Sequence, residues 1–260
     1  MDHVLLGTWR TYVVAEEKKL IRLDKDRLTL VQAATLLVNP TTAYRMLNDF
    51  VKLKPGDWVI QNGANSMVGR AVIEIAKRMG VRTANIVRDR PNFQELADEL
   101  TKLGADVVIK QEELRNPAQR ELFAEAKPLL GLNCVGGPAT TDMARLLGHG
   151  ATLVTYGGMS KQPVTLPTTS FIFNDLRAVG YWMTNWSKQA TREQRQDMFS
   201  ELAKMYHEGS LTAPPVSMVD WTQDSSDDMA TTTVREALEK AMSGYKDTKV
   251  VLSMSYDEQV

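Results

Sequence analysis

Apolar and polar residues alternate in blocks along most of the chain. From Asp57 onward, short β-branched or apolar runs are each followed by a turn and then by a longer amphipathic stretch. One such stretch places its apolar residues on a single helical face, at Phe93, Leu96, Leu100 and Leu103. Because parallel strands are joined by crossover segments that are usually helices, this alternation predicts an α/β fold with helices on both faces of a doubly wound parallel sheet.

The expected elements follow from run length and composition. Short β-rich runs predict six parallel strands, at residues 58–60, 83–87, 107–109, 132–135, 151–156 and 178–182. Amphipathic stretches predict helices at residues 71–79, 93–103, 193–207 and 234–242. Because Pro214 and Pro215 cannot donate to a sheet ladder, residues 211–219 are expected to form an edge strand or a connector, and residues 249–252 a last strand.

Composition and charge narrow the class of protein. The 260 residues include 31 Lys and Arg against 32 Asp and Glu, a formal net charge of -1, so neither nucleic acid nor an anionic membrane is an expected partner. Cys134 is the only cysteine, which excludes an internal disulfide and a cysteine-rich zinc site, and we expect no metal. No apolar stretch approaches the roughly 20 residues of a membrane-spanning helix. The first residues lack the character of a transit or signal peptide, which predicts a cytoplasmic location for the chain as it stands.

A glycine-bounded turn joins the first predicted strand to its helix. Gly63 and Gly69 bound the turn, and Ala64 and Ser66 occupy the first two glycine positions of a G-x-G-x-x-G motif. Small residues let the backbone approach a pyrophosphate, whose charge is held by free N–H groups and the positive end of the helix dipole. The turn therefore indicates a dinucleotide site, and a plain tight turn is the alternative.

Two arginines follow the second predicted strand. Folds that bind NAD carry an acidic residue there for the ribose 2′-hydroxyl, whereas this chain has Arg88, Asp89 and Arg90. Two guanidinium groups suit a 2′-phosphate, which favours NADPH over NADH. The alternative is that both arginines are solvated turn residues that pair with Asp89 or Glu95.

A second glycine-containing segment follows the fifth predicted strand. It consists of Tyr156, Gly157, Gly158 and Met159. This is the carboxyl edge where doubly wound sheets bind ligands, and the glycines would let the chain pass close to a nicotinamide ribose. The alternative is an ordinary glycine turn in which Met159 is loose filler, or in which Met67, Met159 and Met183 are together part of the core.

These segments and several others resemble the mitochondrial trans-2-enoyl-CoA (enoyl-[acyl-carrier-protein]) reductases, a zinc-free branch of the medium-chain dehydrogenase/reductases. The similarity runs from about Leu6 to Met254. It is carried by blocks at residues 7–11, 38–47, 65–66, 86–90, 132–137, 154–159 and 211–214. Long blocks in a fixed order are far more specific than a glycine turn alone.

The resemblance implies a fold, a reaction and a cofactor site. It implies a Rossmann sheet with remnants of a GroES-like catalytic domain at both ends, a homodimer, and NADPH-dependent reduction of trans-2-enoyl thioesters of CoA or acyl carrier protein in mitochondrial fatty acid synthesis. The residues expected to contact NADPH are Asn39, Asn65, Ser66, Met67, Val68, Arg88, Asp89, Arg90, Tyr156, Gly157, Gly158, Met159, Tyr181, Trp182, Met183 and Lys249. Lys249 and the arginines would oppose phosphate, and the neutral amide of Asn39 can hold ribose or nicotinamide.

The chain also departs from the family pattern. Relatives carry a further segment ahead of Gly7 that forms most of the substrate domain and supplies a catalytic tyrosine. Neither Tyr12 nor Tyr44 matches that tyrosine, so the catalytic residue is unknown and a truncated chain with weak or no activity is the expectation. The expected domains are a remnant of the substrate domain at 1–38, the dinucleotide-binding domain at 39–210, and a segment returning to the substrate domain at 211–260.

Two other functions stay open at this point. A non-catalytic module that binds NADPH or dimerises would need only the nucleotide domain, and a quinone-oxidoreductase-like enzyme would share the zinc-free fold. The blocks at Asn39-Pro40 and at residues 156–159 favour the enoyl reductase over the quinone oxidoreductase.

Overall fold

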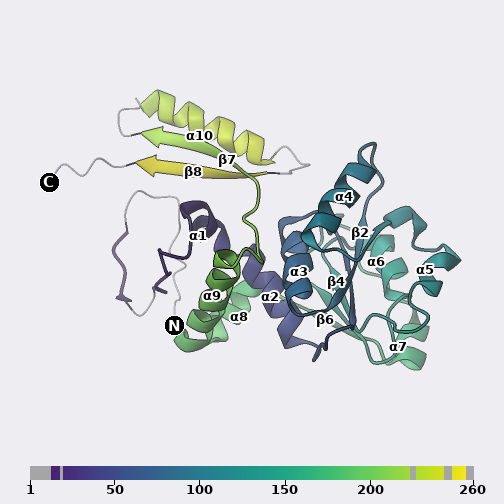
Figure 1. The fold of residues 1–260 in the computed structure, drawn as a ribbon. Coiled ribbons are helices and arrows are strands. Elements are labelled where there is room, and N and C mark those ends of the chain that lie inside the picture. Colours follow the sequence, from purple (N-terminus) through teal and green to yellow (C-terminus); the bar gives the residue numbers. More distant parts are fainter. Residues whose placement is uncertain (1–12, 18–19, 223–226, 243–247, 256–260) are drawn as a thin grey trace. The chain divides into compact units, whose positions relative to one another are not determined.

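The computed structural model describes residues 13–17, 20–222, 227–242 and 248–255, and the chain divides into two compact units (Figure 1). The first, here called the sheet unit, consists of Leu37–Trp186 and Glu208–Thr212. The second, the terminal unit, consists of Met1–Leu36, Ser187–His207 and Ala213–Val260. This division differs from the expected domain boundaries chiefly over residues 187–207, which group with the terminal unit.

Six parallel strands form the centre of the sheet unit, which confirms the predicted fold class. They are β1 (Trp58–Asn62), β2 (Arg82–Val87), β3 (Val107–Lys110), β4 (Leu130–Asn133), β5 (Thr152–Thr155) and β6 (Arg177–Gly180). Their order is β3-β2-β1-β4-β5-β6, and every neighbouring pair is parallel. Strands β1 to β3 are added toward one edge of the sheet and β4 to β6 toward the other, so the order of strands reverses between β1 and β4. Doubly wound sheets bind ligands at this reversal, beyond the carboxyl ends of the strands.

Helices cover both faces of this sheet (Figure 1). In chain order the helices of the sheet unit are α2 (Asn39–Asp49), α3 (Met67–Arg78), α4 (Phe93–Leu103), the 3-10 turn η2 (Gln111–Glu113), α5 (Pro117–Glu121), α6 (Gly137–Ala144) and α7 (Thr168–Asn174). Helix α8 (Met183–Gln189) begins in the sheet unit and ends in the terminal unit. Ile73 of α3 and Leu100 of α4 pack with Val87 in one apolar layer. Met143 of α6 packs with Ile60 in a second layer. The strands are therefore buried on both faces, as their continuous apolar runs predict.

Glycines follow helices α3 and α4 where the sequence predicts them. Gly104 is the C-cap of α4 in a left-handed conformation, with φ 118°, and its N–H bonds the carbonyls of Leu100 and Thr101. Gly80 follows α3 with φ 69°. Only glycine adopts such values without strain, and these turns send the chain back into the next strand.

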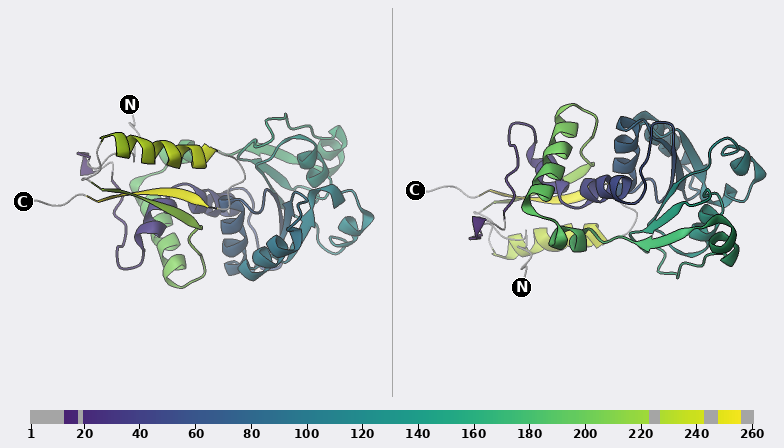
Figure 2. Two further views of the ribbon diagram at one scale, coloured as in Figure 1. Left: turned by 90° about the horizontal axis from the view of Figure 1, so that it is seen from above. Right: turned by 90° about the horizontal axis from the view of Figure 1, so that it is seen from below.

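The terminal unit has its own small sheet. Its elements are α1 (Leu30–Leu36), α9 (Arg192–His207), β7 (Val216–Thr222), α10 (Asp227–Met242) and β8 (Lys249–Ser255). Strands β7 and β8 pair in parallel, and α10 lies along one face of them in both views of Figure 2. Pro214 and Pro215 come just before β7, which is an edge strand as predicted. Within the described ranges, no helix has the length and apolar character needed to cross a bilayer.

Three strands end earlier than predicted, and one of them is β5, which stops at Thr155 rather than at Tyr156. β4 stops at Asn133, so Cys134 and Val135 lie in the loop that follows, and β6 stops at Gly180, so Tyr181 and Trp182 lie beyond it. The start of β4 was missed because it contains a glycine, Gly131, which lowers the strand signal. In the fold that glycine allows close packing, since a Cβ there would lie 3.1 to 3.2 Å from side-chain carbons of Leu153 and Leu147.

Helix α2 was not predicted at all. Its first residues include Pro40, Thr41 and Thr42, which have low helix propensity. The fold accommodates them because Pro40 occupies the first turn and the two threonine hydroxyls donate to the carbonyls of Leu37 and Val38. The helix then packs against α3.

Candidate cofactor site

The turn between β1 and α3 requires glycine at both of its ends. Gly63 has φ 61°, and a Cβ there would lie 2.5 Å from the Cys134 Sγ. A Cβ on Gly69 would lie 2.5 Å from the Ala64 carbonyl oxygen, so the helix can approach the turn only because Gly69 lacks a side chain. Close helix-to-strand packing is the role of the last glycine in dinucleotide-binding turns, and here it is fulfilled although Ala64 and Ser66 replace the first two.

The start of α3 presents unpaired backbone donors. Ser66 is the N-cap, and its Oγ accepts a hydrogen bond from the Gly69 N–H at 3.1 Å. The amide groups of Met67 and Val68 have no acceptor among the described residues. Such orphan amides, together with the helix dipole, attract an anion to this point.

An arginine that sequence reasoning missed holds the turn in place. Arg70 donates from Nε to the Asn65 carbonyl at 3.2 Å, and its two terminal nitrogens bond the Glu99 carboxylate of α4 at 2.7 and 3.0 Å. Its side chain is only 11% exposed. A cation in the first turn of a helix is disfavoured by the helix dipole, and this was the signal that could have identified Arg70 as a residue with a specific partner.

A buried polar network lies under the carboxyl ends of β1 and β4. The Asn133 Oδ1 accepts from Asn62 Nδ2 at 2.8 Å and from the Thr140 hydroxyl at 2.7 Å, and its Nδ2 donates to Thr155 Oγ1 at 3.1 Å. Asn62 in turn accepts from the Cys134 N–H at 2.8 Å. Asn62, Asn133 and Thr140 are fully buried, so the network fixes the loop after β4 from below.

The segment after β5 is bound to that loop. The Tyr156 N–H bonds the Asn133 carbonyl at 2.9 Å, and the Met159 N–H bonds the Cys134 carbonyl at 2.9 Å. A Cβ on Gly157 would lie 3.2 Å from the Cys134 Cβ, which explains the first of the two glycines. Met159 is 67% exposed, so the alternative in which it forms part of the core is wrong.

The hydroxyl of Tyr156 points into this same region. It is buried beside the side chains of Ser66 and Cys134 but makes no hydrogen bond of good geometry. Burial raises the pKa of Tyr156 well above its usual value, and burial also raises the pKa of the Cys134 thiol. A buried polar atom without a hydrogen-bond partner is a position where a ligand can supply that partner.

Arg88, Asp89 and Arg90 follow β2 at the same edge of the sheet. Arg88 and Asp89 are exposed and Arg90 is half-buried. The Asp89 carboxylate is held by Lys110, with Nζ 3.0 Å from Oδ1, and it accepts the Arg90 N–H at 3.0 Å. The alternative, in which Arg88 and Arg90 are solvated turn residues that pair with Asp89 or Glu95, stays open, and the structure shows an ion pair of Asp89 with Lys110.

The remaining predicted residues lie in different places. Tyr181 packs edge-on against Phe50 with ring centroids 5.8 Å apart, its hydroxyl lies 3.1 Å from the Met183 sulfur, and burial raises its pKa. Trp182 is 64% exposed, and Asn39 begins α2. Lys249 belongs to the terminal unit, where burial lowers its pKa. The assignment of these residues to the cofactor site stays a prediction.

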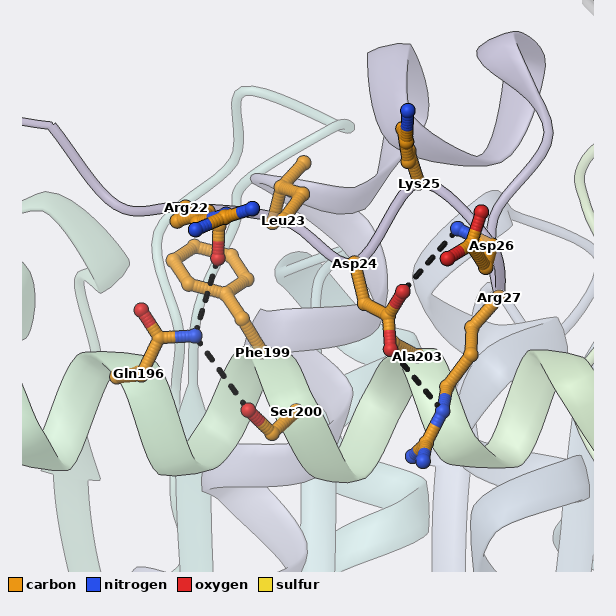
Figure 3. Close-up of a pocket in the computed structure, with 10 residues that line it drawn as sticks. All are labelled: Arg22, Leu23, Asp24, Lys25, Asp26, Arg27, Gln196, Phe199, Ser200 and Ala203. Atoms are coloured by element: carbon orange, nitrogen blue, oxygen red, sulfur yellow. Dashed lines mark hydrogen bonds and ion pairs between the residues drawn. The ribbon is translucent and has the colours of Figure 1, made fainter.

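A cavity of about 490 Å³ lies in the terminal unit (Figure 3). It is bounded by the segment from Arg22 to Arg27 and by α9, where the Gln196 side chain donates to the Arg22 carbonyl at 3.0 Å. The cavity contains none of the predicted cofactor residues. In the described part of the chain, no three His, Cys, Asp or Glu side chains are grouped so that they could hold a metal ion.

The strand order, the glycine turn and the capped helix are those of a dehydrogenase nucleotide domain. The sequence pattern of the zinc-binding dehydrogenase family matches residues 68–204, and the chain therefore belongs to that family. Within it, the chain is similar to the mitochondrial enoyl-[acyl-carrier-protein] reductases. It is 47% identical to the human enzyme over 250 residues, which are 96% of this chain and 64% of the human protein. It is 42% identical to the enzyme of Yarrowia lipolytica, over 96% of this chain and 66% of that protein.

Solved structures give the same relationship. The mitochondrial 2-enoyl thioester reductase Etr1p/Etr2p heterodimer from Candida tropicalis matches with a TM-score of 0.78 and 34% identity, over 84% of this chain and 60% of that one. The complex of Etr1p with NADP and crotonyl-CoA matches with a TM-score of 0.78 and 33% identity, over 88% and 62%. A putative quinone reductase from Bacillus thuringiensis shares the fold, with a TM-score of 0.77, but only 20% identity. The chain thus spans a little under two thirds of the reductases that it matches.

Proposed function

We propose that the protein is an NADPH-dependent reductase of 2-enoyl thioesters. The observation that carries the proposal is the capped start of α3 at the β1–β4 reversal, with the unpaired amides of Met67 and Val68 at one end and Arg88 and Arg90 beyond the neighbouring strand. Diphosphate and 2′-phosphate groups match these two features. The similarity to enoyl reductases, and to one that binds NADP and crotonyl-CoA, supplies the substrate class.

Features at the carboxyl ends of β1, β4 and β5 support this cofactor assignment. The backbone of Ser66 to Val68 would receive the pyrophosphate, because the amides of Met67 and Val68 have no acceptor among the described residues. The unpartnered Tyr156 hydroxyl and the exposed backbone of Gly157 and Gly158 would face the ribose and nicotinamide. When bound, NADPH supplies a hydride to the β-carbon of the enoyl thioester, and a proton is added at the α-carbon. The residues of this chain bind and orient the cofactor, and no proton donor is assigned among them.

The substrate would be a 2-enoyl chain on CoA or acyl carrier protein. The location would be mitochondrial, as the names of the relatives state for those proteins. The direct test measures NADPH binding by fluorescence and NADPH oxidation with crotonyl-CoA. We expect NADPH to bind more tightly than NADH, and crotonyl-CoA to increase NADPH oxidation above the rate without it. Absence of both binding and turnover would overturn the proposal. Binding without turnover would favour the second candidate, a non-catalytic NADPH-binding module.

We also propose that the protein forms a homodimer through the β6 edge of the sheet. Within the described residues, β6 pairs only with β5, so its outer edge has unpaired backbone groups. Helix α7, just before it, exposes Ile172 and Phe173. An unpaired strand beside exposed apolar residues suits pairing with a second copy, and one relative is a heterodimer. Light scattering on the wild-type protein and on Ile172→Glu tests this: a monomeric wild type would contradict it.

A further inference from the structure

A lysine stands beside the arginine segment, at the end of the next strand. In the parallel register of β2 and β3, Lys110 is the partner of Val87, the residue just before Arg88. Its Nζ lies 3.0 Å from Asp89 Oδ1 and 4.9 Å from the centre of the Phe93 ring. The ring and the carboxylate thus hold the ammonium group at the side of the segment.

One oxygen of the Asp89 carboxylate has two donors. Its Oδ1 accepts hydrogen bonds from both Lys110 Nζ and the Arg90 N–H, each at 3.0 Å. The Asp89 N–H donates in turn to Glu112 Oε2 at 3.2 Å. The hydrogen bond from Lys110 lowers the pKa of Asp89, and the same contact raises the pKa of Lys110, so both groups are charged across the physiological range.

The local charge balance depends on this lysine. Six ionised side chains gather at this edge: the cations Arg88, Arg90 and Lys110, and the anions Asp89, Glu112 and Glu113. Three positive and three negative charges sum to zero. Without Lys110 the sum becomes -1 at the point where a 2′-phosphate, itself an anion, would bind, and the Asp89 carboxylate would lose its ion pair with Lys110.

We propose that Lys110 is a positioning residue for cofactor choice: its ion pair with Asp89 neutralises the carboxylate after the second strand, which makes the site selective for NADPH. The inference rests on the proposed NADPH function. A free carboxylate after the second strand is the device by which related folds accept the 2′-hydroxyl of NADH. In this chain such a carboxylate is present, and its pairing with Lys110 withdraws it from that role.

The test compares dissociation constants for NADPH and NADH in five proteins: wild type, Lys110→Met, Lys110→Arg, Asp89→Asn and Lys110→Met combined with Asp89→Asn. We expect Lys110→Met to weaken NADPH about two- to tenfold, with NADH unchanged or tighter. Lys110→Arg should keep the wild-type ratio, because it retains the charge. Adding Asp89→Asn to Lys110→Met should restore NADPH affinity, since the repelling carboxylate is gone.

The controls separate this inference from the function on which it rests. Lys52→Met removes an exposed lysine that precedes the amino end of β1, whereas Lys110 is at the carboxyl end of β3, and should leave both constants unchanged. A wild type that binds NADPH no better than NADH would overturn the proposed cofactor. A wild type that prefers NADPH, together with a Lys110→Met variant that keeps the same NADPH-to-NADH ratio, would overturn only the role of Lys110.

Discussion

Replacement of Asn133 by alanine is expected to destabilise the protein strongly. The side chain is fully buried, and its Oδ1 is the common acceptor for four donors. These are Asn62 Nδ2 at 2.8 Å, the Thr140 hydroxyl at 2.7 Å, the Gly136 N–H at 3.0 Å and the Val135 N–H at 3.2 Å. Alanine would leave all four without this acceptor, in a place where water has little access.

The magnitude follows from counting donors. A buried donor left without a partner costs about 1–3 kcal/mol, and a water molecule admitted to the vacated space can satisfy some of the four. We therefore expect Asn133→Ala to lower the free energy of unfolding by about 3–5 kcal/mol, at the upper end for single substitutions. Thr140→Val has nearly the same shape and removes one donor while the acceptor keeps three others, so its cost should be about 1 kcal/mol.

Urea unfolding of these two variants measures the difference. Asn48→Ala is the matched control, because its amide donates to the Tyr44 carbonyl on the exposed face of α2, and we expect a change of about 0.5 kcal/mol or less. NADPH affinity should fall with Asn133→Ala, since the loop after β4 holds the segment that begins at Tyr156. If Asn133→Ala lowers the free energy of unfolding no more than Thr140→Val does, the network does not hold the loop after β4 in place.

Three further substitutions test the proposed cofactor site, at Gly69 and Arg88, and a buried carboxyl group of α3, at Glu74. Gly69→Ala places a methyl group 2.5 Å from the Ala64 carbonyl oxygen, and because backbone must shift we expect about 2 kcal/mol of destabilisation and weaker NADPH binding; an unchanged melting temperature would contradict this. Arg88→Ala should weaken NADPH binding by about tenfold or more, a loss of at most a few kcal/mol, and should leave NADH binding nearly unchanged in the same titration. Equal losses for the two cofactors would argue against contact with the 2′-phosphate. Burial raises the pKa of Glu74 above 4.5, although the carboxylate accepts two hydrogen bonds from Thr212. The folded state therefore binds the proton more tightly than the unfolded chain, so this contribution to stability is present at low pH and is lost as pH rises through the folded pKa. Glu74→Gln has no carboxyl group to titrate, so it does not lose this stability as the pH rises. Unfolding measured at pH 5 and pH 8 should show that the free energy of unfolding of the variant increases relative to that of the wild type at the higher pH.

The fold and the chemistry of the site were predictable from the sequence to different extents. Glycines, β-rich runs and amphipathic stretches are local signals, and they predicted the parallel sheet and the strand-to-helix turn at Gly63 and Gly69. The arrangement around Asn133 was not predictable in this way. In the sequence it interrupts an apolar run and was assigned to a strand, and its partners come from β1, α6 and β5. Only the strand order brings these elements together.

The same reasoning explains the charged edge. The sequence shows Arg88, Asp89 and Arg90 as neighbours, and a local reading pairs opposite charges within the segment. The parallel register of β2 and β3 instead places Lys110 next to Val87, so Asp89 has a partner more than twenty positions away. A local pattern could indicate a phosphate site, but it could not tell which cation neutralises the carboxylate beside it.

Neutral and charged side chains lie in different parts of the proposed cofactor site. Under the carboxyl ends of β1 and β4, Asn62, Asn133 and Thr140 carry no ionisable group, and burial keeps Cys134 and Tyr156 in their neutral forms. A carboxylate among these buried side chains would repel a pyrophosphate across a region of low dielectric, where screening is weak. The cluster of Arg88, Asp89, Arg90 and Lys110 lies instead at the exposed end of β2 and β3, where solvent lowers the cost of holding charge. In the proposed function, the neutral side chains would fix the position of the cofactor, and the charged edge would select NADPH over NADH.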